Sequence, residues 1–97
     1  MTDYQAPVRQ MRFTIEHLAD FQAVAVLPDF SSVDGDTMQA VLEEAAKFAG
    51  SVLAPINWLG DRQGVKVVDD AVQVPKEFAG AYRQFCEAGW PGIASNP

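Results

Sequence analysis

This sequence of 97 residues has little of what marks several common functional classes. Its one cysteine, Cys86, cannot form an internal disulfide and has no partner at the spacing of a zinc site. No stretch approaches the roughly 18 apolar residues that span a bilayer, and the N-terminus lacks the basic and apolar regions of a signal peptide. We therefore expect no metal ligands, no membrane span and a cytoplasmic location.

Positive charge is also scarce. The seven lysines and arginines stand singly among 13 acidic residues, and the formal net charge is -6. Nucleic-acid binding needs basic groups clustered on one surface, so we expect no nucleic-acid partner. No glycine-rich turn of the kind that cradles a phosphate is present either.

What the sequence does contain is a strong helical pattern over Asp36–Ala54. Its apolar residues recur at three-four spacing and form one face of a predicted helix: Met38, Val41, Leu42, Ala45, Phe48, Ala49, Val52 and Leu53. We expect Phe48, which is central in this face, to be fully buried. The pattern indicates a helical core and says nothing about chemistry.

The ends and the polar face of this helix carry further signals. Ser32 or Asp34 can accept hydrogen bonds from the first turn, and Glu43 precedes Lys47 by four residues, the favourable order for a helical ion pair. Pro55 disfavours helical backbone in the residue before it, so a kink or an end is expected near Ala54.

Shorter patterns predict the remaining elements. The apolar spacing of Val8–Asp20 predicts a helix, and the composition of Phe21–Ser32 predicts a connector. The glycines of Ile56–Gly64 indicate a helix end followed by a turn. Two β-branched runs predict a hairpin with strands Val65–Val68 and Val72–Val74 around a turn of Asp69–Ala71. The final aromatic stripe predicts a helix over Pro75–Ala88. The predicted fold class is mainly α, one small domain over residues 1–97 with about three helices and one short β-hairpin.

The chemically active side chains form no recognisable catalytic pattern. His17 is the only histidine, and we expect it on the surface, because no nucleophile lies near it in sequence. Glu43 and Glu44 are adjacent, so they point about 100° apart on a helix and cannot chelate together.

The remaining candidates also favour structural roles. Asp69 and Asp70 are expected at the exposed tip of the hairpin, where nothing would split their pKa values into an acid and a base. Cys86 falls on the apolar stripe of the last predicted helix, so we expect a buried thiol. We accordingly name no catalytic, cofactor-binding or metal-binding residue.

The order of the pieces carries more information than any one of them. The chain reads YQAPVRQMRF, then VLEEAAKFAGSVLAPINWLGDRQG, then a valine hairpin, then PKEFAGAYRQFCEAGWPGIASNP. Over nearly its whole length it resembles the N-terminal region of the long acyl-CoA dehydrogenases. Its first arm, Tyr4–Phe13, is similar to the branch that includes methylthiopropionoyl-CoA dehydrogenases. The family's usual glycine in the hairpin turn is replaced here by Asp69, Asp70 and Ala71.

This resemblance implies a fragment of a flavoenzyme that oxidises acyl-CoA to 2-enoyl-CoA. In that family a catalytic glutamate removes the α-proton, FAD accepts the hydride, and electrons leave to an electron-transfer flavoprotein. The resemblance places the glutamate and the main flavin contacts in later domains, so this chain alone is expected to bind no FAD and to be inactive. The uncharged ending GWPGIASNP fits a chain cut after Pro97, within a loop.

Two consequences for partners follow from these expectations. The partners implied by the resemblance are the remaining domains of the parent enzyme, and a homo-oligomer is expected because cutting the chain would uncover Trp90, Ile93 and Trp58. The alternative is a free-standing helical interaction module that binds a partner through the stripe of Phe78, Tyr82 and Phe85.

Overall fold

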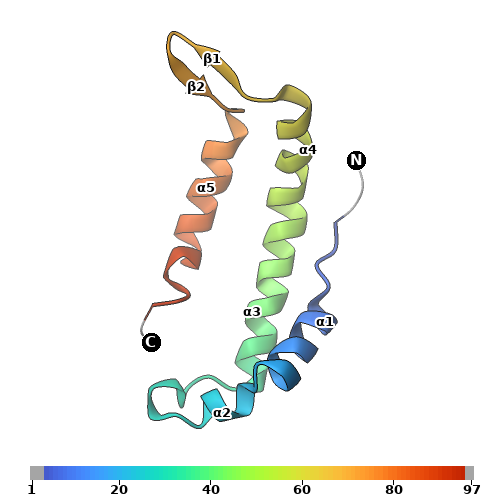
Figure 1. Ribbon diagram of the computed structural model, residues 1–97, viewed down its shortest axis with the longest axis vertical. Helices are drawn as coiled ribbons and strands as arrows, with labels where there is room; N and C mark the ends of the chain where they lie inside the picture. The colour runs from blue at the N-terminus through green and yellow to red at the C-terminus, as the bar shows by residue number, and fades with distance from the viewer. Residues whose placement is uncertain (1–3, 96–97) are drawn as a thin grey trace. The chain divides into compact units, whose positions relative to one another are not determined.

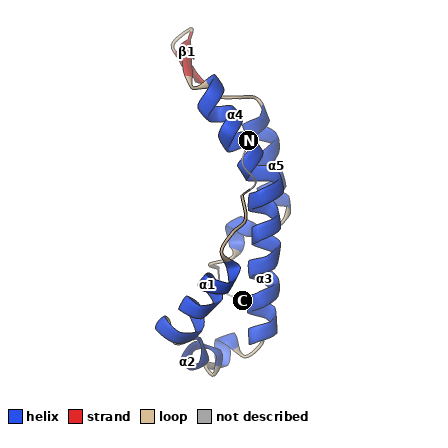
Figure 2. Ribbon diagram, turned by 90° about the vertical axis from the view of Figure 1, so that its right-hand side faces the viewer, coloured by secondary structure: helices blue, strands red, loops and turns tan. Residues whose placement is uncertain are grey.

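The computed structural model describes residues 4–95, and it is mainly helical with one antiparallel hairpin, as predicted (Figures 1 and 2). These residues fall into two compact units, 5–49 and 50–95, with Tyr4 belonging to the second. The helices of the first unit are α1 (Val8–Phe13), a π-helix (Thr14–Leu18), α2 (Phe21–Ala25), a 3-10 turn (Pro28–Phe30) and α3 (Gly35–Phe48). A π-helix (Ala49–Leu53) then leads into the second unit, which holds α4 (Ala54–Gln63), β1 (Lys66–Val68), β2 (Ala71–Gln73), α5 (Glu77–Glu87) and a 3-10 turn (Trp90–Gly92).

The first helical run is slightly shorter than predicted. It begins at Val8 as expected but ends at Leu18, and Asp20 has a left-handed backbone with φ of 54°. Asp tolerates this conformation better than most residues, so it can turn the chain between two helices. The apolar start of the expected connector forms the short α2, and its Pro28 opens the 3-10 turn.

The start of α3 resolves the choice between two capping residues. The Oδ1 atom of Asp34 accepts a 2.8 Å hydrogen bond from the backbone N–H of Thr37, so Asp34 is the N-cap. This contact satisfies one of the free N–H groups of the first turn. It also holds the pKa of Asp34 below its usual value, because the N–H groups stabilise the ionised carboxylate.

Pro55 neither ends the helical run nor leaves it regular. The run continues from α3 into α4, and the five residues before Ala54 adopt π-helical geometry. Proline has no N–H to donate to the carbonyl four residues earlier, and its ring crowds that carbonyl. A locally widened helix accommodates both effects, and Pro55 then occupies the first turn of α4, where a missing N–H costs little.

Burial along α3 differs from the expectation at Phe48. Met38 is buried, with 8% of its surface exposed, whereas Phe48 is only half-buried and Val41 is exposed. The three-four spacing identifies the apolar face of the helix, but burial depends on what packs against each residue of that face. The prediction of a fully buried Phe48 is therefore wrong.

The polar face of α3 carries two further contacts. Lys47 Nζ lies 3.0 Å from Glu44 Oε1, three residues earlier, while Glu43 accepts a 2.8 Å hydrogen bond from Gln39. Side chains three and four residues apart are neighbours on a helix surface, so both contacts support α3 locally.

The hairpin has a tighter turn than the sequence suggested. Val67 pairs with Val72 and Val68 with Ala71, so Ala71 lies in a strand and the loop is only Asp69 and Asp70. Both aspartates have positive φ, 52° and 63°, as a two-residue type I′ turn requires. This geometry matches the twist of the strands, which explains why the turn needs no third residue.

Candidate functional site

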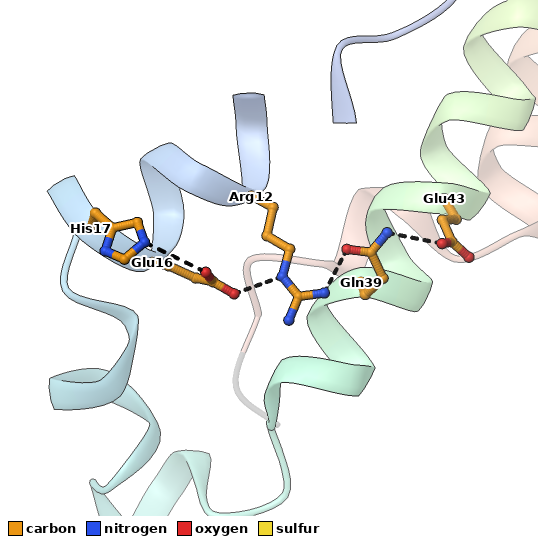
Figure 3. Close-up of polar contacts among 5 residues, drawn as sticks. All are labelled: Arg12, Glu16, His17, Gln39 and Glu43. Carbon is orange, nitrogen blue, oxygen red and sulfur yellow. Dashed lines mark hydrogen bonds and ion pairs between the residues drawn. The ribbon is translucent and has the colours of Figure 1, made fainter. Parts of the chain in front are cut away.

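In the first unit a chain of polar side chains joins the first helical run to α3 (Figure 3). Arg12 Nε donates to Glu16 at 2.6 Å and Arg12 Nη1 donates to Gln39 at 2.8 Å. Gln39 in turn donates to Glu43. The bond between Arg12 and Gln39 links α1 to α3, and we assign this cluster a structural role.

His17 lies at the outer end of this cluster. Its Nε2 is 3.9 Å from Glu16 Oε2, and its ring lies 4.7 Å from that of Phe13 with the two planes tilted by 49°. The histidine is exposed, as predicted, and no serine or cysteine contacts it in these interactions. Among the described residues, no group of three or more His, Cys, Asp or Glu could hold a metal ion.

Cys86 is exposed, which corrects the expectation of a buried thiol. It falls on the stripe of α5, but that part of the stripe has no cover in this structure. Tyr82, 67% exposed and one turn earlier, has a raised pKa, because its phenol is hydrogen-bonded to the Cys86 side chain and a thiolate there would repel a phenolate. The Tyr82 and Phe85 rings stack at 6.2 Å.

In the second unit a shallow recess of about 370 Å³ lies where α4, the hairpin and the approach to α5 meet. Its lining carries two cations, Arg62 and Lys66, and no carboxylate. Arg62, however, lies over the Trp58 ring at 5.1 Å, and the recess adjoins the C-terminal end of α4, where the helix dipole disfavours an anion. We assign no flavin contact to this recess.

The base of the hairpin is a close contact between α4 and α5. A Cβ on Gly60 would lie 2.7 Å from the tip of the Phe78 ring, so this glycine allows the ring to approach the helix backbone. Pro75, just before α5, is buried. Ala81, within α5, is also buried, with 5% of its surface exposed. These contacts fix the hairpin's ends and position the strands beyond them.

The strands themselves carry the most distinctive surface of the described chain. Val67 and Val72 face each other across the ladder. Val65 and Val74 flank the two strands, and the two-residue period of a strand assigns them to the same side, although Val74 also borders the recess. We call these four residues the valine face. They are exposed by 62%, 73%, 67% and 53% in chain order, and every residue of both strands is exposed.

The size of the valine face can be estimated. Burying a valine is worth about 1.5–3 kcal/mol at about 25 cal/mol per Å², which corresponds to roughly 60–120 Å² per side chain. Four valines about two-thirds exposed therefore offer on the order of 200 Å². The alternation of valines in the sequence was the signal that could have identified this face. The sequence predicts the hairpin, but not which of its side chains are exposed.

Comparison with known proteins confirms the predicted resemblance. The chain is 37% identical over 91 residues to the 3-methylmercaptopropionyl-CoA dehydrogenase of Ruegeria pomeroyi. The match covers 94% of this chain and only 16% of that protein, so this chain spans about one-sixth of its relative's length. No family model matches the chain. No described helix has the length and apolar character needed to cross a membrane.

Proposed function

We propose that this chain is the N-terminal structural part of a flavin-dependent acyl-CoA dehydrogenase, which oxidises an acyl-CoA to a 2-enoyl-CoA. The observation that carries the proposal is the 37% identity extending over 94% of the chain. The order of its segments, which resembles the N-terminal region of that family, supports the same placement. The chain's own role is to form one wall of the enzyme, and catalysis belongs to the remaining domains.

The structure of the described residues supports this division of labour. The polar cluster around Arg12 links α1 to α3, and we assign no flavin contact to the recess beside Lys66. FAD, the catalytic carboxylate and the contacts to an electron-transfer flavoprotein are accordingly assigned to the rest of the parent protein. We propose a homo-oligomeric, cytoplasmic enzyme of acyl-CoA metabolism, in which this chain alone is inactive.

A chimeric enzyme tests the proposal. In the Ruegeria pomeroyi dehydrogenase, the residues matched by this chain would be replaced with the present sequence. We expect the purified chimera to retain FAD in its visible spectrum and to reduce an artificial electron acceptor when given 3-methylmercaptopropionyl-CoA. The matched control is the same enzyme with this region in scrambled order, which should lose both properties.

A second experiment uses the isolated 97-residue chain. Purified with excess FAD, it should retain no flavin after gel filtration and should not oxidise the thioester. A chimera without flavin or activity, or an isolated chain with stoichiometric flavin, would contradict the proposal. The first result would favour the free-standing interaction module.

A further inference from the structure

We propose that the valine face of the β1–β2 hairpin docks onto an uncharged aliphatic surface in the remaining part of the same dehydrogenase polypeptide. This inference rests on the proposed function and deepens it, because it names the surface through which the chain is held. The other potential occupant is a second copy of the chain, and the size of the face decides between them.

The chemistry of the face defines the partner. Val65, Val67, Val72 and Val74 carry no polar side-chain atom. Lys66 and Gln73 alternate with Val67 and Val72 along the strands and so face away from those two valines. An apolar surface gains from burial only against another apolar surface, since a polar partner would lose its hydrogen bonds to water. The partner surface is therefore aliphatic and uncharged.

The hairpin is preorganised for such a contact. An isolated two-stranded hairpin is marginal in water. Here its ends are fixed by the Gly60–Phe78 approach and by the buried Pro75, and its turn has the geometry that matches the strand twist. A surface that is already ordered loses less conformational freedom on docking, so a small contact becomes more effective.

The area of the face favours a tethered partner over a second copy. Two valine faces packed together would bury on the order of 400 Å², whereas specific complexes of separate proteins bury about 1,200 Å² or more. A partner in the same polypeptide is present at millimolar effective concentration, so it needs much less area. The dehydrogenase that this chain matches provides ample polypeptide for it, because the match covers 16% of that protein.

The test uses the chimeric dehydrogenase with Val67→Thr and Val72→Thr together. Threonine keeps the shape and strand preference of valine but places a hydroxyl in the docked surface. The control chimera carries Lys66→Thr and Gln73→Thr on the opposite face. We expect the valine pair to lower the temperature of flavin release by about 3 °C or more relative to the control pair.

The same substitutions in the 97-residue chain separate docking from folding. Because the valines are exposed there, Val67→Thr with Val72→Thr should leave its helical circular dichroism and melting temperature unchanged. An active chimera whose flavin-release temperature responds equally to both pairs would overturn the docking proposal alone. A dimer of the isolated chain, seen by sedimentation and abolished by the valine pair, would assign the face to a second copy. An inactive, flavin-free parent chimera would overturn the proposed function and this inference with it.

Discussion

Residues 5–49 and residues 50–95 use different chemistry where two helices meet. In the first unit Arg12 donates hydrogen bonds to Glu16 and to Gln39, and so links α1 to α3. In the second unit the tip of the apolar Phe78 ring approaches α4 at a glycine, Gly60. The first contact depends on charge and salt, and the second on volume. Substitutions that change one property at a time should therefore separate the two units.

The largest effect is expected at the buried methionine of the first unit. Met38→Ala removes a side chain of which only 8% is exposed, so we expect the free energy of unfolding to fall by about 2–4 kcal/mol. Urea unfolding followed by circular dichroism measures this loss. Glu44→Ala, on the exposed face of the same helix, should change stability by less than about 0.5 kcal/mol. Equal losses would show that the faces of α3 are wrongly assigned.

Two glycine substitutions sharpen the comparison in the second unit. Gly60→Ala places a methyl group against the tip of the Phe78 ring. Overpacking costs about 1–3 kcal/mol, and the helix preference of alanine returns about 0.5–1 kcal/mol, so we expect a net loss of up to about 2 kcal/mol. Gly80→Ala, in α5, has no atom within 4 Å of the new methyl group and should stabilise the helix by about 0.5–1 kcal/mol. Thermal melts of the two variants should therefore move in opposite directions. Stabilisation by both would mean that Phe78 does not lie against Gly60.

The polar contact of the first unit should give a smaller, salt-dependent effect. Arg12→Met removes both hydrogen bonds but keeps the apolar stem, and about one-third of the Arg12 side chain is exposed. We expect a loss of about 0.5–1.5 kcal/mol at low salt and a smaller loss at roughly 1 M NaCl. Gly60→Ala should show no such salt dependence. If salt changes the stability loss of both variants equally, the two helix contacts do not differ in their dependence on charge.

The smallest effect concerns the cap of α3. The pKa of Asp34 in the folded chain lies below its usual 3.8, so its stabilising contribution is fully present above that value. This contribution is lost as the pH falls through the lowered pKa. Asp34→Ser keeps a capping oxygen that does not titrate, so its unfolding curves at acidic pH should lose less stability than those of the parent chain. If stability falls with pH in the same way in both chains, the Asp34 carboxylate does not stabilise the start of α3.

Helical spacing and turn residues predicted most of the fold. The apolar spacing located the starts of the first helical run and of the central one, and the β-branched runs located the hairpin. The central run continues past the predicted end near Ala54 into α4. The π-helix before Pro55 was harder to predict from the sequence. Proline permits a kink, a helix end or a widened turn, and tertiary packing selects among them. The turn was misplaced by one residue because Asp at both central positions is a weaker signal than Asn-Gly.

Burial was the least predictable property. Phe48 and Cys86 both lie on apolar stripes, yet one is half-buried and the other exposed. A stripe shows which side of a helix is apolar, but not which of its residues another element covers. The valine face has the same explanation under the proposed function, since its cover lies in another part of the polypeptide.

The most direct test of this account is to determine the coding sequence beyond the Pro97 codon and to purify the protein that it encodes. We predict an open reading frame, a protein several times longer than this chain, and a bound flavin that is bleached by an acyl-CoA. A stop codon directly after Pro97, together with a colourless monomer that binds no acyl-CoA, would contradict the account. The free-standing interaction module would then be the better explanation of the exposed valine face.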